Sequence, residues 1–365
     1  MPERSHPPDA ASRDARTDIR AMSLDELAKV ITDAGERPFR ARQAMAWLWK
    51  KGAESFDLMR DVPAALRDHL RDELRLTPLR TVAVRSADGT RKLLFTLGDD
   101  EAVEGVIIPT DGRVTLCISS QVGCAMGCGF CATARMRLHR NLNTAEIAAQ
   151  VIAARRELDP GEVLTNYVFM GMGEPLANYN QLARALTIMT ADWGMGISPR
   201  RITVSTVGLL DSMNRLLSEF SVNLAVSLHA TTDDVRSRIV PINRRFPIDE
   251  LIESCKRLPI ARRSRITFEY VMLAGINDSL EDARRLAKLL GPLRAKVNLL
   301  QFNPFPDSGF APSPPHVIEA FQARLMQANL TATVRRSRGQ DIAAACGQLY
   351  AERPPAVARG AHPFA

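Results

Sequence analysis

The chain has 365 residues, of which 45% are hydrophobic and 24% are charged, and this is the balance of a folded globular protein with room for a second, smaller domain. The formal charge of +7 is compatible with a polyanionic partner such as nucleic acid. No stretch approaches the ~20 apolar residues that cross a membrane, and the N-terminus lacks the apolar core of a secretory signal. The sequence therefore predicts a soluble cytoplasmic protein without a membrane partner.

The N-terminal part is predicted to be helical. Residues 1–20 are polar and are expected to form a disordered tail, and residues 21–78 are expected to form a helical accessory domain. Its first helix opens on the capping-box pattern SLDE. The predicted helices cover residues 23–34, 39–51 and 61–75. Trp47 and Trp49 are expected to fill the core of this domain, and a nucleic-acid platform is the alternative.

Residues 79–112 switch to a period of two with turn signals, which predicts a β-meander that links the helical domain to the next one. From residue 113 to 340 strands and helices alternate regularly. Six β/α units follow the strand VTLCISS, so parallel strands with right-handed crossovers are expected. The count is too small for a closed eight-stranded barrel, and it predicts an α/β fold with an open, partial (β/α)6 barrel whose ligands bind at the C-terminal strand ends.

The stretch CAMGCGFC, from Cys124 to Cys131, places three cysteines at C-x3-C-x2-C spacing. In a reducing compartment such a cluster indicates metal binding or catalysis. Three core thiols by coincidence, a zinc knuckle with a distant fourth ligand such as His139, and a ferredoxin-type cluster with four thiolates are weaker explanations. A [4Fe–4S] cluster with three protein ligands would leave one iron open, which is typical of a catalytic site.

This spacing, with Phe130 before the last cysteine and a partial barrel around it, resembles the radical S-adenosylmethionine (SAM) superfamily. The resemblance implies that Cys124, Cys128 and Cys131 hold a [4Fe–4S] cluster and that SAM occupies the open iron. In FMGMGEPL, Gly171, Gly173 and Glu174 are similar to the motif that contacts the SAM amino group. Polar residues at later strand ends are the other predicted SAM contacts, namely Ser205, Ser227, Leu228, His229 and Asn303.

Several longer motifs in the same order make the resemblance more specific. They are VEGVIIP, TLCISSQVGCAMGCGFCATA, FMGMGEPLAN, VSTVGL, SLHA and DIAAACGQL. Together they resemble the RlmN/Cfr family of RNA adenine methyltransferases over about residues 20–350. The MGMGEPL form and the chain length favour the C2-methylating branch, and the alternative is the sister branch that methylates C8 of the same adenine.

The resemblance implies a mechanism with two SAM molecules per turnover. Cys346, in a catalytic segment over residues 341–350, would become an S-methylcysteine, and its methyl carbon would be joined to the adenine ring. Glu104 would accept the ring proton, and Cys117 would resolve the adduct through a transient disulfide with Cys346. Without the resemblance, Glu104 is more simply a solvent-facing strand carboxylate and Cys117 a core residue. Cys255 is interpreted as a thiol without a catalytic role.

The implied substrates are an adenine in the peptidyl-transferase centre of 23S rRNA and the adenine 3′ of the anticodon in some tRNAs. The candidates for phosphate contacts are Arg40, Arg42, Lys50, Lys51, Arg335, Arg336 and Arg338, which could equally form solvated faces. A flavodoxin-type reductant and a monomeric state are expected, and residues 351–365 are expected to form a disordered tail. The alternatives are a different radical SAM enzyme and, in another class, a zinc-dependent RNA-binding protein.

Overall fold

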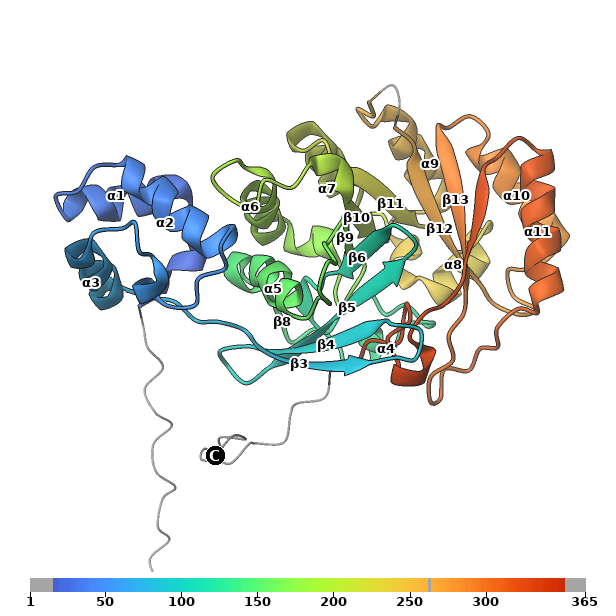
Figure 1. Cartoon of the computed structure of the whole chain (residues 1–365). Coiled ribbons are helices and arrows are strands. Elements are labelled where there is room, and N and C mark those ends of the chain that lie inside the picture. Colours follow the sequence, from blue (N-terminus) through green and yellow to red (C-terminus); the bar gives the residue numbers. More distant parts are fainter. Residues whose placement is uncertain (1–15, 262–263, 352–365) are drawn as a thin grey trace, which may run out of the picture. The chain divides into compact units, whose positions relative to one another are not determined.

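The computed structural model describes residues 16–261 and 264–351. The chain divides into two compact units, one made by residues 1–78 with 191–195 and one by 79–190 with 196–365 (Figure 1). None of the helices among the described residues is long and apolar enough to cross a membrane.

The first unit is built from three short helices. Their bounds are α1 (Leu24–Asp33), α2 (Phe39–Trp49) and α3 (Ala64–Glu73), with 3-10 turns η1 (Ile19–Ala21) and η2 (Phe56–Leu58). The expected capping box starts α1, since the backbone N–H of Glu26 donates to Ser23 Oγ at 3.1 Å and the Glu26 carboxylate accepts from Ser23 N–H. Trp49 is fully buried, whereas Trp47 is half-buried and carries the Lys51 ammonium 3.5 Å from its ring centroid. Trp49 therefore fills the core of this unit.

The prediction of a disordered tail up to residue 20 is wrong at its end. Strand β1 (Thr17–Asp18) pairs in parallel with β2 (Leu74–Arg75), and Ile19 and Arg20 are buried. The Arg20 guanidinium donates to the carbonyl oxygen of Ala53 at 2.9 Å, which lets a charged side chain enter the core. A polar sequence pattern does not reveal such a backbone partner. The rest of that predicted tail, residues 1–15, and residues 352–365 of the other lie outside the described residues.

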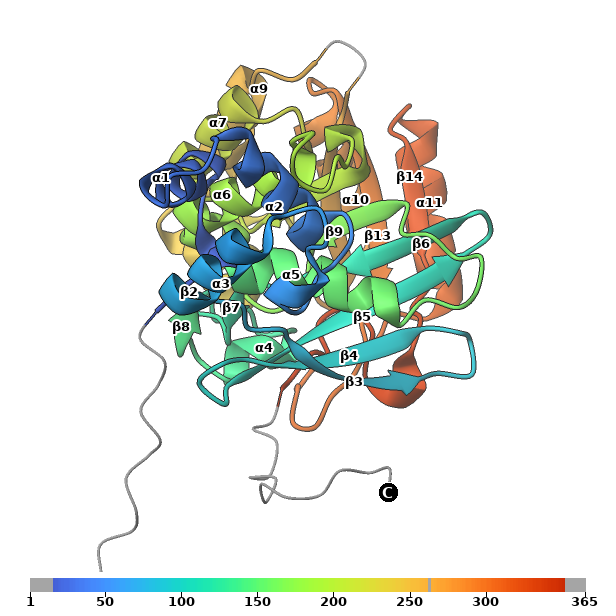
Figure 2. The same ribbon diagram turned by 60° about the vertical axis from the view of Figure 1, so that its left-hand side comes forward.

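The second unit is organised around one ten-stranded sheet with the order β14-β13-β12-β11-β10-β9-β6-β5-β4-β3. Three antiparallel strands at one end are β3 (Arg80–Arg85), β4 (Arg91–Thr96) and β5 (Ala102–Thr110) (Figure 2). Seven parallel strands follow, which are β6 (Arg113–Cys117), β9 (Asn166–Phe169), β10 (Ile202–Thr206), β11 (Asn223–Ser227), β12 (Ile266–Met272), β13 (Ala295–Gln301) and β14 (Ala332–Arg335). Because β14 and β3 end the sheet without pairing with each other, the predicted open α/β barrel is confirmed.

The crossovers between parallel strands are helical, and the helices cover the outer face of the curved sheet (Figure 1). They are α5 (Thr144–Arg156), α6 (Tyr179–Thr190), α7 (Leu210–Glu219), α8 (Asp233–Ile239), α9 (Ile248–Arg257), α10 (Leu280–Leu290) and α11 (Pro315–Gln327). Short 3-10 turns complete the connections, namely η3 (Pro175–Asn178), η4 (Pro199–Arg201), η5 (Pro241–Arg244) and η6 (Gln340–Ile342). The sequence pattern predicts each of these crossover helices except α8, which has only seven residues.

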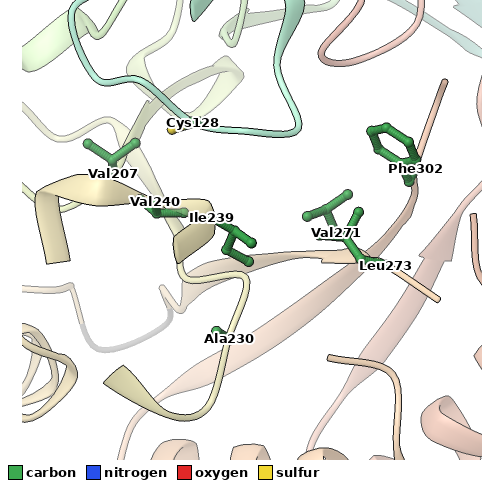
Figure 3. Packing of buried hydrophobic residues seen from close by; sticks show 8 residues of the cluster. All are labelled: Cys128, Val207, Ala230, Ile239, Val240, Val271, Leu273 and Phe302. Atoms are coloured by element: carbon green, nitrogen blue, oxygen red, sulfur yellow. The ribbon is translucent and has the colours of Figure 1, made fainter. Parts of the chain in front are cut away.

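A hydrophobic cluster packs between the strand ends and the loop that carries the three cysteines (Figure 3). Its buried members are Cys128, Val207, Ala230, Ile239, Val240, Val271, Leu273 and Phe302. Half-buried Met126, Phe130 and Cys131 pack against this cluster from the cysteine loop. The burial of Cys128 among aliphatic side chains fixes the loop against the barrel and removes water from one side of it.

Candidate active site

Two adjoining cavities lie at the C-terminal ends of the parallel strands. The first, here called the cluster cavity, has a volume of about 160 Å³ and is lined by Cys124, Cys128 and Cys131 together with residues at the ends of β9 to β14. The second, here called the thiol cavity, has a volume of about 50 Å³ and is lined by Cys117, Cys346 and Arg335, among others. Cys346 and Arg335 line both cavities. The site therefore lies where ligands of parallel α/β folds bind.

The cysteine loop is closed at its base by a small antiparallel pair, β7 (Gln121–Val122) and β8 (Arg140–Asn141). The Gln121 side chain strengthens this closure by donating to Asn141 Oδ1 at 2.7 Å. Helix α4 (Ala132–Arg135) begins directly after Cys131. The three cysteines thus lie on one short loop held at both ends, a rigid support for a bound group.

The three thiols are suited to binding a group of positively charged metal ions, and the cavity that they line leaves room beside that group. Burial raises the pKa of Cys124 to about 12, and burial together with the neighbouring thiols raises the pKa of Cys128 well above its usual value. Only nearby positive charge would let three such thiols ionise together, and thiolate sulfur is the usual ligand of iron–sulfur clusters. Three thiols that line one cavity fit a cluster of several metal ions, whose own sulfide ions supply the remaining ligands.

His139 does not complete the cysteine set. Its Nδ1 lies 3.5 Å from a carboxylate oxygen of Glu101, and it does not line the cluster cavity.

Gly173 and Glu174 tie the end of β9 to the cysteine loop. Gly173 has a φ of 98°, and a Cβ there would lie 2.5 Å from Cβ of Gln121, so only glycine fits. The backbone N–H of Glu174 donates to Gln121 Oε1 at 2.8 Å, which links the motif to the closure of the loop. The Glu174 carboxylate lines the cluster cavity and accepts from Leu176 N–H at 3.0 Å and Val207 N–H at 2.9 Å. Burial raises its pKa to about 7, so a ligand cation would stabilise its charged form.

The predicted contacts at the next strand ends are brought together, with one exception. Ser205, Ser227 and His229 line the cluster cavity. The Leu228 side chain is fully buried and does not line it, and its carbonyl oxygen accepts from Arg236 Nε at 3.0 Å. Leu228 follows the last residue of β11, between two residues of the SLHA motif that line the cavity, and its own side chain packs in the core.

His229 is held in a strained conformation as a neutral ring. Its φ is 59°, and its Nδ1 accepts from the backbone N–H of Val271 at 3.0 Å, which places the ring proton on Nε2. Burial lowers its pKa to about 3. The ring meets Phe130 edge to face with centroids 4.6 Å apart. Strain of this kind at a cavity wall is a mark of a functional position.

Cys346 is held in place by hydrogen bonds of its neighbours. Asn303, which lines both cavities, donates through its side chain to the carbonyl oxygen of Cys346 at 3.2 Å. The N–H of Ala132 donates to the Gly347 carbonyl at 2.7 Å, and Thr133 Oγ1 donates to that of Leu349 at 2.6 Å. The segment that carries Cys346 is thereby docked on helix α4, which follows the third cysteine.

The second predicted thiol, Cys117, lies at the end of β6 in the thiol cavity with Cys346. Both cysteines are free thiols. Cys117 is buried, and this burial raises its pKa to about 12, an effect to which the nearby Cys346 adds and which Arg335 opposes. The structure therefore brings together a buried thiol and an exposed one across the small cavity.

Glu104 is buried and is placed apart from both cavities. Its carboxylate pairs with Lys92 Nζ at 3.0 Å and accepts from the backbone N–H of Tyr350 at 2.9 Å. Val106, two residues along the same strand face, does line the thiol cavity. The expectation of a solvent-facing carboxylate is wrong, because Lys92 and the segment after Cys346 cover it.

Sequence reasoning missed Glu269, which lies in the middle of β12 and lines the cluster cavity. Its Oε1 accepts from Asn298 at 3.0 Å, whereas its buried Oε2 has no hydrogen-bond partner. Burial raises its pKa. The available signal was a carboxylate in the middle of a predicted strand. Every residue of this strand is buried, and burial of a carboxylate costs free energy unless a ligand or partner compensates for it.

The remaining predictions concern Cys255 and the basic residues that are candidates for phosphate contacts. Cys255 is buried on α9 and lines neither cavity, as expected of a thiol without a catalytic role. Arg42, Lys50 and Lys51 are exposed on the first unit and Arg40 is half-buried, while Arg336 and Arg338 are exposed on the second unit. Arg335 faces the cavities, so it differs from the surface group in which the sequence places it.

A loop of three cysteines at the open end of a partial parallel barrel, with a glycine–glutamate turn beside it, defines a radical SAM enzyme. In agreement, residues 118–289 match the family model described as the radical SAM superfamily. Members of this superfamily use a [4Fe–4S] cluster and SAM, and the cysteine loop and the cluster cavity of this chain fit both. Residues 17–76 match a second model, the ribosomal RNA large subunit methyltransferase N-terminal domain.

The chain belongs to the RlmN family of radical SAM RNA methyltransferases. It is 52% identical to the dual-specificity RNA methyltransferase RlmN of Anaeromyxobacter dehalogenans, over 94% of each chain. It is 49% identical to the protein of the same name from Geobacter sulfurreducens, over 92% of each chain. A crystal structure of a radical SAM methyltransferase from Sphaerobacter thermophilus is 46% identical and superposes with a TM-score of 0.88, covering 92% of this chain and all of that one.

Proposed function

We propose that this enzyme methylates C2 of one adenosine in 23S rRNA, in the peptidyl-transferase centre, and C2 of the adenosine 3′ of the anticodon in some tRNAs. The observation that supports this proposal is the position of Cys346, which lines both the cavity of the three cysteines and the cavity of Cys117. A sulfur shared between the two cavities can receive a methyl group in one of them and form a disulfide with Cys117 in the other. C2 of adenine lies between two ring nitrogens and is too electron-poor to take a methyl cation from SAM directly.

Cys124, Cys128 and Cys131 would hold the cluster, and the cluster cavity would hold SAM. When bound and reduced, the cluster supplies the electron that cleaves SAM and gives a 5′-deoxyadenosyl radical. Glu174 would bind the amino group of SAM, because its buried carboxylate faces the cavity beside the cysteines. Ser205, Ser227, His229 and Asn303 would bind the rest of the molecule. Phe130 and Phe302 line the same cavity and would exclude water from the reaction.

Cys346 would carry the methyl group. Its exposed thiol takes a methyl group from the first SAM by displacement, and its S-methyl carbon is then joined to the ring after the loss of one hydrogen atom to the radical. The hydrogen bond from Asn303 to the Cys346 carbonyl and the docking of Gly347 on Ala132 would keep the sulfur at the boundary of the cavities throughout. Orientation of this kind supplies much of the rate of such a step.

Glu104 and Cys117 would complete the reaction. Glu104 accepts the ring proton in this proposal, which requires its carboxylate to exchange the N–H of Tyr350 for the substrate. After the adduct has given its unpaired electron to a one-electron acceptor, for which the oxidised cluster would serve, Cys117 attacks the sulfur of Cys346. The resulting disulfide frees the base, whose methylene carbon takes a proton to become the methyl group. The role of Glu104 therefore implies that residues 349–351 move when RNA binds.

The RNA would reach the cavities with its target base turned out of the stack. Arg336 and Arg338, which are exposed beside the thiol cavity, are the nearest candidates for phosphate contacts. On the first unit, the exposed Arg42, Lys50 and Lys51 are separate candidates for phosphate contacts. We propose further that a flavodoxin-type protein supplies the electrons and that the enzyme acts as a monomer in the cytoplasm, where its RNA substrates are.

The test is an anaerobic reaction of the iron-reconstituted enzyme with SAM, a reductant and unmodified 23S rRNA, followed by mass spectrometry of the nucleosides. We expect 2-methyladenosine. The appearance of 8-methyladenosine would assign the enzyme to the sister branch, and 5′-deoxyadenosine without a methylated base would refute the proposed substrate. The Cys346→Ala variant is expected to lose methyl transfer while it still cleaves SAM, and Cys255→Ala is its matched control because that thiol lines neither cavity.

A further inference from the structure

Arg335 occupies the boundary of the two cavities without a carboxylate partner. It ends strand β14, where it lies beside Leu300 of β13, and both residues line the two cavities. Its Nη1 lies 3.9 Å from the sulfur of Met170, which is a weak contact. Throughout residues 16–261 and 264–351, no carboxylate forms an ion pair with this guanidinium. An arginine without such a partner in a cavity wall is available to another anion.

The anions near this guanidinium are the two cysteine sulfurs of the thiol cavity and the carboxylate of Glu269 in the cluster cavity. The charge of Cys346 is the main cause that raises the pKa of Arg335, and Glu269 and Cys117 add to it. Conversely, Arg335 lowers the pKa of Cys117, although burial raises that pKa by more. The geometry is independent of these pKa values, since Cys117, Cys346 and Arg335 line one cavity of about 50 Å³.

The other charged groups around the cavity are placed differently. Arg336 and Arg338 also line it, but they are exposed, so water and salt weaken their effect. Glu269 lines only the cluster cavity, and Glu104 is paired with Lys92 behind the lining. The thiol of Cys131 also lies near enough to Cys346 to be affected by its charge.

We propose that Arg335 is a positioning residue that stabilises the thiolate of Cys117 while it attacks the sulfur of Cys346. This inference rests on the proposed function, and it adds a residue that acts on the release step. The bond that forms is the S–S bond between the two cysteines, and the bond that breaks joins the Cys346 sulfur to its substituent. The electron pair of the broken bond stays with the methylene carbon of the base, which takes a proton to become the methyl group, and the proton of Cys117 is lost to solvent before the attack.

The expected size of the effect follows from two opposing terms. An opposite charge at close range lowers a pKa by about 1 to 3 units, and each unit raises the thiolate fraction about tenfold. The same change reduces the nucleophilicity of the thiolate about threefold per unit, because the Brønsted coefficient of such attacks is about 0.4–0.5. The net gain is about three- to fourfold per unit, so loss of the charge should slow the attack about tenfold.

The experiment uses the cluster-loaded enzyme, reduced and kept anaerobic, with neutral 4,4′-dithiodipyridine as the probe. The exposed Cys346 thiol forms a mixed disulfide with the probe and releases one thiopyridone. The Cys117 thiolate then attacks the Cys346 sulfur, closes the disulfide and releases a second thiopyridone, which imitates the release step without RNA. The rate of this second phase is measured against pH, and peptide mass spectrometry identifies the disulfide.

We expect the second phase to be about tenfold slower in Arg335→Met, with its pH profile displaced to higher pH, and to be close to wild type in Arg335→Lys. Arg335→Gln repeats the test if the methionine variant does not fold. Arg113→Met is the matched control, and its loss should be much smaller because that exposed side chain at the start of β6 lines neither cavity. A second phase that is equally fast in wild type and Arg335→Met overturns the inference and leaves the proposed function standing.

If the wild-type enzyme shows no second phase while Cys346 is labelled, Cys117 does not reach Cys346. That result would refute the proposed release step and the inference with it. The Cys117→Ala variant must also lose the second phase, since Cys255 is buried elsewhere and should not replace it.

Discussion

Replacement of Arg236 by methionine tests how the wall of the cluster cavity is held. This arginine lies on α8 and is fully buried, and its guanidinium reaches the ends of two barrel strands. It donates to the carbonyl oxygens of Val207 at 2.8 Å, Leu228 at 3.0 Å and Ser227 at 3.2 Å. A further bond, at 2.9 Å, reaches the side-chain oxygen of Asn243. The charged group therefore connects β10, β11 and η5 behind the cavity.

The expected loss of stability follows from these bonds and from the cost of the buried charge. Three bonds of 3.0 Å or shorter from a charged donor contribute about 1.5–3 kcal/mol each. Burial lowers the pKa of Arg236 to about 10, well below its ordinary value, and at about 1.4 kcal/mol per pKa unit the charge costs about 3 kcal/mol. The variant avoids that cost but leaves the carbonyl oxygens without a donor. We expect a net loss of about 3–5 kcal/mol in the free energy of unfolding, as for other buried charges with one partner removed.

Urea denaturation at neutral pH measures this loss, and Arg238→Met is the matched control on the same helix. Arg238 is exposed, so its replacement should change the free energy of unfolding by less than about 0.5 kcal/mol. A loss below about 1 kcal/mol for Arg236→Met would show that the carbonyl oxygens find other donors and would refute the reasoning. SAM binding by the folded fraction should also weaken, since Ser227 lines the cavity.

Three further predictions concern the cluster cavity. Because burial raises the pKa of Glu174 to about 7, its carboxyl is neutral at low pH, and SAM affinity should rise about tenfold between pH 6 and pH 8. Equilibrium dialysis with the cluster-loaded enzyme measures this, and a flat profile would contradict it. Glu269→Gln keeps an oxygen that accepts from Asn298 but removes the charge of the second oxygen, Oε2, so SAM affinity should fall about tenfold in the same assay. An unchanged affinity would show that Oε2 accepts no hydrogen bond from the ligand. In Gly347→Ala, the added Cβ would lie 3.1 Å from the Phe130 carbonyl oxygen at a φ of 83°, so Cys346 should shift. The ratio of methylated base to 5′-deoxyadenosine should then fall severalfold, and an unchanged ratio would show that the segment tolerates a side chain there.

The sequence predicts the fold well because its signals are local. The alternation of strands and helices and the spacing of the three cysteines are properties of short segments, and the structure has seven parallel strands where seven are expected. The polar residues at strand ends are predicted for the same reason, since parallel strands end at one edge.

The environment of each site residue depends on contacts between distant segments, and there the sequence is insufficient. The pairing of Glu104 with Tyr350 joins residues 246 positions apart. Arg335 faces the cavities because it pairs with Leu300 in the sheet. A register shift of one residue would turn its side chain to the opposite face. The direction of the Leu228 side chain, which is buried and turned away from the cluster cavity, is likewise not given by its place in the SLHA motif.

The place of Cys346 near the end of the chain has a consequence for incomplete products of translation. All ten strands of the main sheet, the three clustered cysteines and Glu174 precede it in the sequence. A chain interrupted after residue 340 would therefore keep the strands of the barrel and the three cysteines, yet it would lack the sulfur that, in the proposed mechanism, directs the radical to a methyl group. Quality control of such fragments would protect the cell from a radical generator without a substrate.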